Sequence, residues 1–404
     1  MKKRFIIATS IMVVLAASRT FATEGINLIG IGPIQQGTAG AGVASAKDST
    51  WLILNPAGLT DIQRGVDASF QVFAPVRTMD STMSGGAGEQ SDNSAFVIPS
   101  ISASFGCCHG ENGMFGIGIY GTSGMGVDYN YGRVGQMNPP PTPPSSQNSY
   151  DQTTELSIAK MTATYAYRFG DSGLSIGAGP IFVVSRFRTD MFDMSFTPGS
   201  MDWDTSYGGG AIFGINQKWG AFSIGGSYMS KQWMSKFDTY NSLMPVSLDL
   251  PQQITLGVAY NVLDNLELVC DYRWIGWGEE KTFGSQYGWS NQNIFKVGAT
   301  WGVTEALTLR TGLSYGRSPI NSNNAFSNAL FPAIMEMHFA CGASYYWEKW
   351  AAHVAYIHAF ENSVTANGSD MDAIYPGTGI GGMASGTKIS MYQNSLTLGV
   401  SRSF

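Results

Sequence analysis

Residues 25–61 read GINLIGIGPIQQGTAGAGVASAKDSTWLILNPAGLTD, and this stretch decides how the rest of the chain is interpreted. It is rich in small residues and shows neither a helical period nor strict alternation, so it has no face with which to build its own core. It ends in a compact turn at Asn55, Pro56 and Ala57, where the proline fixes φ. Such a segment needs a container, and the sequence that follows predicts one.

The residues before this stretch have the pattern of a secretory signal. Lys2, Lys3 and Arg4 precede an apolar run over residues 5–17, and Ala22 is a small residue of the kind found before a cleavage site. We therefore predict a signal peptide over residues 1–22. A membrane anchor is the weaker alternative, because the run is shorter than the roughly 20 residues that span a bilayer.

The composition favours a protein surrounded by lipid. Charged residues make up 13% of the chain, against about 25% in soluble domains, and 50 of the 404 residues are glycine. No later apolar stretch is long enough for a spanning helix. Low charge without such a helix is typical of strands that alternate lipid-facing and lumen-facing residues. The net charge of −6 argues against a nucleic-acid partner.

Segments of about ten residues with alternating hydrophobicity follow, separated by turn signals. Short links such as residues 304–306 alternate with long ones such as residues 361–388, which is typical of barrels with short periplasmic turns and long outer loops. We predict an all-β fold, a transmembrane antiparallel β-barrel of about 14 strands over residues 64–404, with residues 23–63 as an N-terminal hatch (plug) inside the lumen. The expected strands are residues 64–77, 95–107, 114–127, 153–169, 173–189, 203–216, 220–232, 246–261, 266–278, 291–303, 307–317, 334–347, 350–360 and 389–404.

Alternation also predicts which way side chains point. In residues 307–317, Leu309 and Leu313 share one face and Arg310 lies on the other. A charge on the lipid face costs about 2–4 kcal/mol at the bilayer midplane, so charged side chains are expected to point into the lumen.

Several motifs together resemble the FadL family of outer-membrane transporters for long-chain fatty acids and other hydrophobic molecules. They are Asn55-Pro56-Ala57, LPQQITLGVAY (residues 250–260), DYRWIGW (271–277), LTLRTGLSYGRSPI (307–320) and the closing SLTLGVSRSF. Each is loose alone, and their order over essentially the whole mature chain makes the set specific. The resemblance implies a hatch inside the barrel and a kink in the third strand that opens a lateral path into the outer leaflet.

The third predicted strand is rich in glycine, which favours such a kink. Glycine in a strand interior weakens pairing and marks bulges or close backbone approaches. The same glycines have a second explanation, because they could make room for the hatch against the wall. They are Gly116, Gly118, Gly121, Gly124 and Gly126.

A fatty-acid carboxylate in an apolar pocket needs a cation, because an unpaired buried charge is costly. A structural ion pair with Asp271, Glu267 or Glu336 is the alternative role for each candidate, and we weight it higher. The lumen-facing candidates are Arg310, Arg273, Lys296 and Lys160. Apolar lining from the hatch is predicted at Leu52, Ile53, Leu54 and Leu59.

The sequence shows no catalytic or metal-binding pattern. A nucleophile elbow, a paired-His motif and a Cys–His signature are missing. The cysteines lack metal-ligand spacing, and whether Cys107, Cys108, Cys270 and Cys341 form disulfides is left open. We expect a monomer in the outer membrane that is not an enzyme and uses no cofactor or metal, with an apolar small molecule and membrane lipid as partners.

The predicted function is therefore passive uptake of hydrophobic molecules, captured by apolar outer loops such as residues 326–331 and released sideways through the kinked third strand. Lateral exit avoids moving the molecule through water, which costs about 0.8 kcal/mol per CH₂ group. The alternatives are a general porin for small polar solutes, a lipid hydrolase that uses His338, and a surface structural protein.

Overall fold

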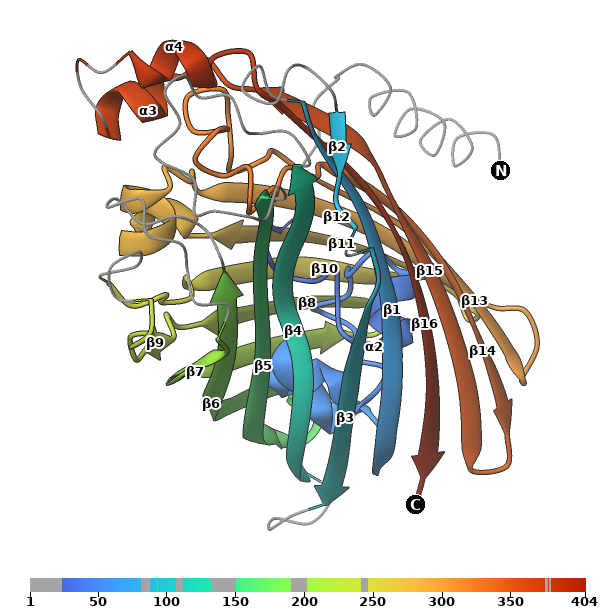
Figure 1. The fold of residues 1–404 in the computed structure, drawn as a ribbon. Coiled ribbons are helices and arrows are strands. Elements are labelled where there is room, and N and C mark those ends of the chain that lie inside the picture. Colours follow the sequence, from blue (N-terminus) through green and yellow to red (C-terminus); the bar gives the residue numbers. More distant parts are fainter. Residues whose placement is uncertain are drawn as a thin grey trace.

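The structure is a computed structural model that describes residues 24–80, 88–92, 94–106, 112–131, 150–189, 202–240, 246–374, 377 and 379–404. The predicted signal peptide, Cys107 and Cys108 lie outside the described residues. Fourteen long strands form the wall of the described part (Figure 1). They are β1 (Gly65–Asp80), β3 (Phe96–Gly106), β4 (Gly113–Tyr131), β5 (Tyr150–Arg168), β6 (Leu174–Thr189), β7 (Asp204–Trp219), β8 (Phe222–Met229), β10 (Gln253–Leu263), β11 (Leu266–Ile275), β12 (Gln292–Gly302), β13 (Leu307–Gly316), β14 (Met337–Trp347), β15 (Trp350–Thr365) and β16 (Lys388–Ser403).

The first long strand closes the barrel, because β1 pairs antiparallel with β3 on one side and with β16 on the other. Its register with β16 runs from Gly65 opposite Ser403 to Asp80 opposite Lys388 without a shift. Two short strands, β2 (Gly88–Gln90) and β9 (Trp233–Met234), pair with β1 and β7 outside this cycle. The predicted all-β barrel of about fourteen strands is confirmed.

Side chains alternate between the two faces of the wall as the sequence predicts. On β16, Leu396 and Leu398 are more than 40% exposed on the outer face, while Ser395 and Thr397 point inward and are almost completely buried. Apolar side chains outside and polar ones inside are the arrangement that lipid around a barrel requires.

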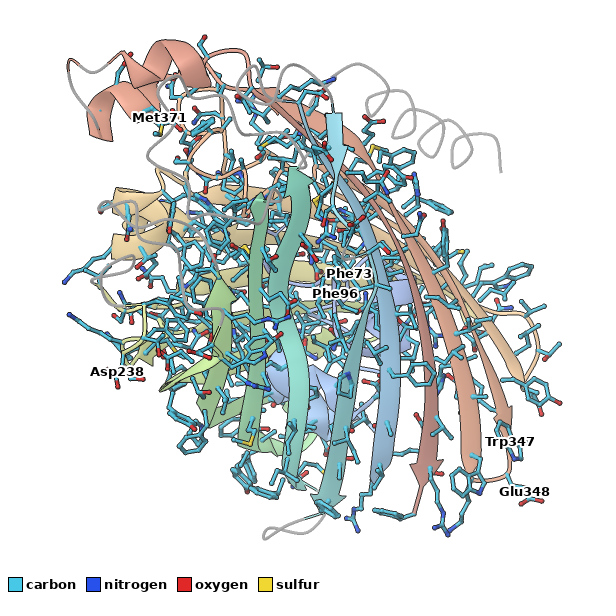
Figure 2. All side chains as sticks on the ribbon, in the orientation of Figure 1. Phe73, Phe96, Asp238, Trp347, Glu348 and Met371 are labelled. Atoms are coloured by element: carbon cyan, nitrogen blue, oxygen red, sulfur yellow. The ribbon has the colours of Figure 1, made fainter. Side chains whose placement is uncertain are left out.

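The two ends of the barrel differ strongly. Glu348 and Lys349 alone link β14 to β15 at the short-turn end, where Figure 2 labels Trp347 and Glu348. The long-loop end carries α3 (Ser369–Ile374) and α4 (Ile380–Ala384) (Figure 1). Among the described residues, we find no helix with the length and apolar character that crossing a membrane demands.

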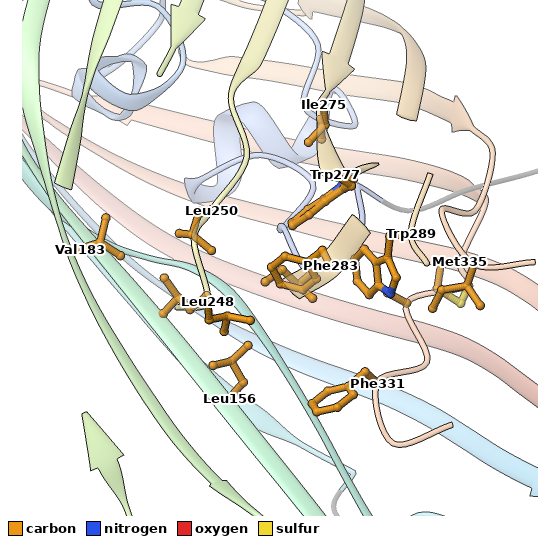
Figure 3. Close-up of a cluster of buried hydrophobic side chains, with 14 of the residues drawn as sticks. Leu156, Val183, Leu248, Leu250, Ile275, Trp277, Phe283, Trp289, Phe331 and Met335 are labelled. Carbon is orange, nitrogen blue, oxygen red and sulfur yellow. The ribbon is translucent and has the colours of Figure 1, made fainter. Parts of the chain in front are cut away.

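Aromatic side chains form a core within the long loops (Figure 3). Trp277 begins the 3₁₀ helix η6 (Trp277–Glu279) and stacks edge-on against Phe283 of the π-helix η7 (Lys281–Gln286), with ring centres 4.7 Å apart. Phe331 packs 5.5 Å from the Tyr287 ring and is 4% exposed. The expectation that residues 326–331 present an exposed apolar surface is therefore corrected, because this loop buries Phe331 in its own core.

The hatch lies inside the barrel as three short helical segments, α2 (Gly32–Gly37), η1 (Ser49–Ile53) and η2 (Pro56–Asp61), drawn in blue in Figure 1. Asn55 caps η2, because its side-chain oxygen accepts a hydrogen bond of 3.1 Å from the Ala57 amide. The predicted boundary between residues 63 and 64 falls between η2 and β1.

Candidate functional site

A cavity of about 680 Å³ lies between the start of the hatch and strands β1, β3, β4 and β5. We call it the wall cavity. Its lining is mainly apolar, with Phe73, Phe96, Ile98 and Leu156 among the contributing side chains. Phe73 and Phe96 face each other on paired strands with ring centres 6.4 Å apart (Figure 2). Its volume lies within the range of about 300–1,000 Å³ that is usual for small-molecule sites.

The wall cavity reaches the outer face of the barrel. Val97, Ile101 and Ile119 also line it, and these side chains are 70%, 52% and 49% exposed on the face that meets lipid. The cavity therefore extends from the hatch through the wall.

An interruption of strand pairing explains this passage. β3 and β4 pair from Gly106 opposite Met114 up to Ser100 opposite Tyr120, and the pairing stops there. Beyond it, β3 remains paired with β1 and β4 continues along β5, with a register shift between Gly121 and Ser123. A bulge of this kind bends a strand and increases its twist, so the wall lacks a continuous ladder here.

The first described residues of the hatch bind β4 at this bulge. The Leu28 amide donates to the Thr122 carbonyl at 3.0 Å, and the Gly124 amide donates to the Ile26 carbonyl at 3.2 Å. Residues 24–31, which we call the N-terminal segment, thus supply partners that β3 does not provide, and residues 25–29 line the wall cavity.

A second, much smaller cavity of about 50 Å³ lies on the other side of the N-terminal segment. We call it the polar pocket. Lys160, Arg273 and Thr255 contribute to its lining, together with Asn27 and Leu28. Because Asn27 and Leu28 line both cavities, they form the partition between an apolar space and a cationic one.

The five glycines named for the third predicted strand all lie on β4, but they have different surroundings. Cβ atoms added at Gly116 and Gly118 would lie 2.5 Å from a Leu52 methyl group and 2.0 Å from the Tyr120 hydroxyl, so these two glycines make room for the hatch and for a buried tyrosine. Gly121, Gly124 and Gly126 line the wall cavity at and beyond the bulge. Gly116 thus makes room for the hatch, whereas the role of Gly121, Gly124 and Gly126 in a lateral path stays a prediction.

The predicted apolar residues of the hatch lie elsewhere, and that expectation is corrected. Leu52 and Leu59 are completely buried between hatch and wall, while Ile53 and Leu54 line the polar pocket. None of the four is among the residues that line the wall cavity. The helical segments of the hatch bury these side chains against the barrel, which leaves the extended N-terminal segment to face the cavity.

Two of the four predicted cations bind the N-terminal segment itself. The Glu24 carboxylate forms ion pairs with Arg273 on β11 and Lys296 on β12, and the Glu24 and Lys296 side chains are inaccessible to solvent. The structural ion pair expected for these two cations is therefore present, but its carboxylate is that of Glu24. The prediction that Asp271, Glu267 or Glu336 supplies the carboxylate is corrected, because these side chains bind other groups.

Asp271 accepts hydrogen bonds of 2.8 and 2.9 Å from the Gly42 and Val43 amides of the hatch. Glu267 pairs with Lys47 at 2.8 Å. Glu336 accepts a hydrogen bond of 2.7 Å from the Ser318 amide in a long loop. The first two carboxylates therefore hold the hatch, and the third holds a loop.

The other two predicted cations bind neutral groups. Arg310 donates to Ser344 Oγ at 2.6 Å and to the Tyr346 hydroxyl at 3.3 Å, and Lys160 donates to Gln232 Oε1 at 2.8 Å. Neither forms an ion pair among the described residues. Lys160 and Arg273 line the polar pocket, and none of the four lines the wall cavity.

A cation that the sequence analysis missed, Arg77 on β1, does line the wall cavity. Its guanidinium donates to the Gly126 carbonyl and to Ser91 Oγ, and it lies 5.7 Å from the centre of the Phe96 ring. Alternation could have found it, because Gln71, Phe73 and Arg77 share the lumen face of β1.

The C-terminal part of the hatch is tied to the wall near the short-turn end. Asn55 Nδ2 donates to the carbonyls of Val43 and Ile215 at 2.8 and 3.1 Å. Asp61 forms ion pairs with Arg168 and, at 2.9 Å, with Lys218. These contacts join η2 to β5 and β7.

The described residues hold no group of three or more metal-ligating side chains. Cys270 and Cys341 are free thiols. His338 is buried on the lumen face of β14 and lacks a hydrogen-bond partner within the described part of the chain. No arrangement of nucleophile and base is seen around it there.

Comparison with known proteins identifies a similar family and solved structures with the same barrel fold. Residues 202–395 match the family described as "Outer membrane protein transport protein (OMPP1/FadL/TodX)". The toluene transporter TodX of P. putida shares the fold with a TM-score of 0.68 at 16% identity, over 93% of this chain and 99% of that one. A FadL homologue of Pseudomonas aeruginosa gives 0.65 at 14% identity, over 95% and 100% of the two chains.

The monoaromatic hydrocarbon channel CymD gives a TM-score of 0.62 at 16% identity, over 94% of this chain and 99% of that one. No curated protein sequence matches the chain. Identities this low establish a shared fold only. The match over residues 202–395 makes this part of the chain similar to the OMPP1/FadL/TodX family of outer membrane transport proteins, and the whole described chain shares the barrel fold of these solved structures.

Proposed function

We propose that this chain is an outer-membrane channel for the passive uptake of hydrophobic molecules. The wall cavity carries the proposal, because it is apolar, has the volume of a small-molecule site and extends from the hatch to the lipid-facing side of the wall. A polar solute would gain nothing from such a lining, whereas an apolar one is stabilised by about 0.8 kcal/mol for each buried CH₂ group.

Lateral release is the second part of the proposal. The ladder between β3 and β4 ends at Ser100 and Tyr120, next to Gly121. A molecule that leaves the wall cavity there passes directly into lipid, so it never crosses the water of the short-turn end. This route needs no energy source beyond the concentration gradient of the molecule.

The names of similar proteins suggest the class of molecule. TodX is a toluene transporter and CymD a monoaromatic hydrocarbon channel, while another similar structure is a FadL homologue. We propose that the cargo is a monoaromatic hydrocarbon, a long-chain fatty acid or a compound of comparable apolar size. Arg77 offers a cation at the wall cavity for cargo with an acidic group.

A general porin is the alternative transport function, and the hatch argues against it. Asp271, Asn55 and Asp61 tie the hatch to the wall on several strands, so the lumen is occupied. A porin would conduct ions steadily in a planar bilayer, whereas this channel is expected to conduct little.

We further propose that the chain acts as a monomer and catalyses no reaction.

Uptake by cells tests the proposal. Cells that lack the protein should take up labelled toluene or oleate more slowly, and the wild-type chain should restore uptake. Replacing Gly121 and Gly124 with valine places side chains against Ile98 and the Leu156 carbonyl at the wall passage, which should reduce uptake several-fold. Replacing Gly226 and Gly302, which contact no residue of the hatch, is the matched control. Undiminished uptake by the Gly121 and Gly124 variant would contradict lateral release.

A further inference from the structure

Glu24 occupies a cationic site that is built from the barrel wall. One carboxylate oxygen faces Arg273 Nη1 and the other faces Lys296 Nζ, so the carboxylate is bound from two neighbouring strands. No part of the Glu24 side chain is accessible to solvent. A buried carboxylate is retained when close ion pairs of this kind offset the loss of hydration.

The two cations have few other partners. Arg273 Nε donates to Thr255 Oγ1 at 3.1 Å, and Lys296 Nζ lies 3.4 Å from the Gly40 carbonyl oxygen. Asp271 is the cross-strand neighbour of Lys296, but its Oδ2 atom accepts the hatch amides. The positive charge of this site is therefore compensated mainly by a residue of the N-terminal segment rather than by the wall.

Glu24 also lies at the end of the partition between the two cavities. Gly25, next in the chain, lines the wall cavity, and Asn27 and Leu28 separate it from the polar pocket. Arg273 lines the polar pocket, together with Lys160. A ligand with an apolar tail in the wall cavity thus has a cationic site directly behind the partition.

We propose that Arg273 and Lys296 form an anion-binding site that Glu24 occupies as an internal competitor. An amphiphile with a carboxylate head binds there by displacing the Glu24 carboxylate, while its tail remains in the wall cavity. A neutral apolar molecule cannot replace Glu24 and leaves the ion pairs intact. Glu24 is then a specificity-determining residue that lowers the affinity for acids relative to neutral compounds. This inference rests on the proposed function.

Binding of two matched ligands to the full chain in lipid nanodiscs tests the inference. Decanoate and decanol have tails of the same length and differ in head-group charge. Glu24→Gln removes the competing charge and keeps the size of the side chain. We expect this variant to bind decanoate about tenfold more tightly than the wild type, the equivalent of one charge-assisted contact, and to bind decanol with unchanged affinity.

Glu267→Gln is the matched control, because Glu267 also pairs with a hatch lysine but lies outside the cationic site. It should change the affinity for neither ligand. Unchanged decanoate binding in Glu24→Gln would overturn the inference. An equal gain for both ligands would overturn it as well, since that result means a loosened partition rather than a vacated anion site.

A second variant covers the case in which Glu24→Gln fails to fold. Glu24→Gln combined with Lys296→Met removes one charge of each sign and leaves Arg273 available. It should still favour decanoate over decanol relative to the wild type, and loss of that preference would count against the inference. If neither ligand binds the wild type or any variant, the proposed function itself fails, a result distinct from binding without discrimination.

Discussion

The two ends of the hatch are held to the barrel in very different ways. Residues 42–61 are fixed by side chains from several strands, with Asp271 binding two amides and Asp61 binding two cations. Residues 24–31 are held by the ion pairs of Glu24, by one hydrogen bond of 2.8 Å from Ser123 Oγ to Asn27 Oδ1 and by backbone hydrogen bonds to the bulge of β4. We propose from this difference that residues 42–61, which we call the fixed part, stay in place and that any rearrangement of the hatch is confined to the N-terminal segment.

The largest effect is expected at Asp271, the central contact of the fixed part. Asp271→Ala leaves the Gly42 and Val43 amides unpaired and removes a carboxylate beside Lys296, at a site that is 1% exposed. Breaking a buried charged contact costs about 3–5 kcal/mol, so the free energy of unfolding in urea should fall by that amount. Asp264→Ala, in an exposed turn, is the control. An unfolding midpoint equal to the wild-type value would show that the hatch is fixed by other contacts.

A smaller effect is expected at Asn55, which caps η2 and binds two carbonyl groups. Asn55→Ala removes the hydrogen bonds to Val43, Ile215 and the Ala57 amide. Loss of a helix cap costs about 1–2 kcal/mol, which thermal unfolding of the purified barrel would detect. Asn265→Ala removes one exposed hydrogen bond to Gly302 at the short-turn end and should change the stability much less. An equal decrease of the unfolding temperature in the two variants would show that Asn55 does not belong to the fixed part.

The smallest effect is expected at Glu267, at the margin of the fixed part. Its pair with Lys47 is partly exposed to solvent, with 31% of the lysine side chain accessible. Exposed ion pairs contribute about 0–1 kcal/mol, so Glu267→Gln should lower the free energy of unfolding by no more than that, and less at high salt. A loss as large as that of Asp271→Ala would erase the distinction between the centre of the fixed part and its margin.

Prediction from sequence succeeded for the strands, because the same two-residue alternation of side chains runs through each of them. Each of the fourteen expected strand segments overlaps one long strand of the barrel, and Arg310 and Leu309 face inward and outward as alternation requires. A strand buried against lipid on one face and against the lumen on the other repeats every two residues, and that repeat is visible without a structure.

The contacts of the hatch could not be predicted in the same way. Leu52 and Leu54 were expected to meet the cargo, yet they pack against the wall or the polar pocket, and residues 25–29 line the wall cavity instead. The pairing of Glu24 with Arg273 leaves no signal in the sequence, because 249 positions separate the two residues in the chain. An irregular segment has no period that reports which side chains face the wall.

The sequence by itself determined the barrel, its two unequal ends and the presence of a segment that has to be contained. These follow from alternation, loop length and composition, which are local properties of the chain. Only the tertiary structure decided where β3 and β4 part, which residues line the wall cavity and which carboxylate binds Arg273 and Lys296. Those features depend on how the hatch is seated in the lumen, and that position is set by contacts between residues far apart in sequence.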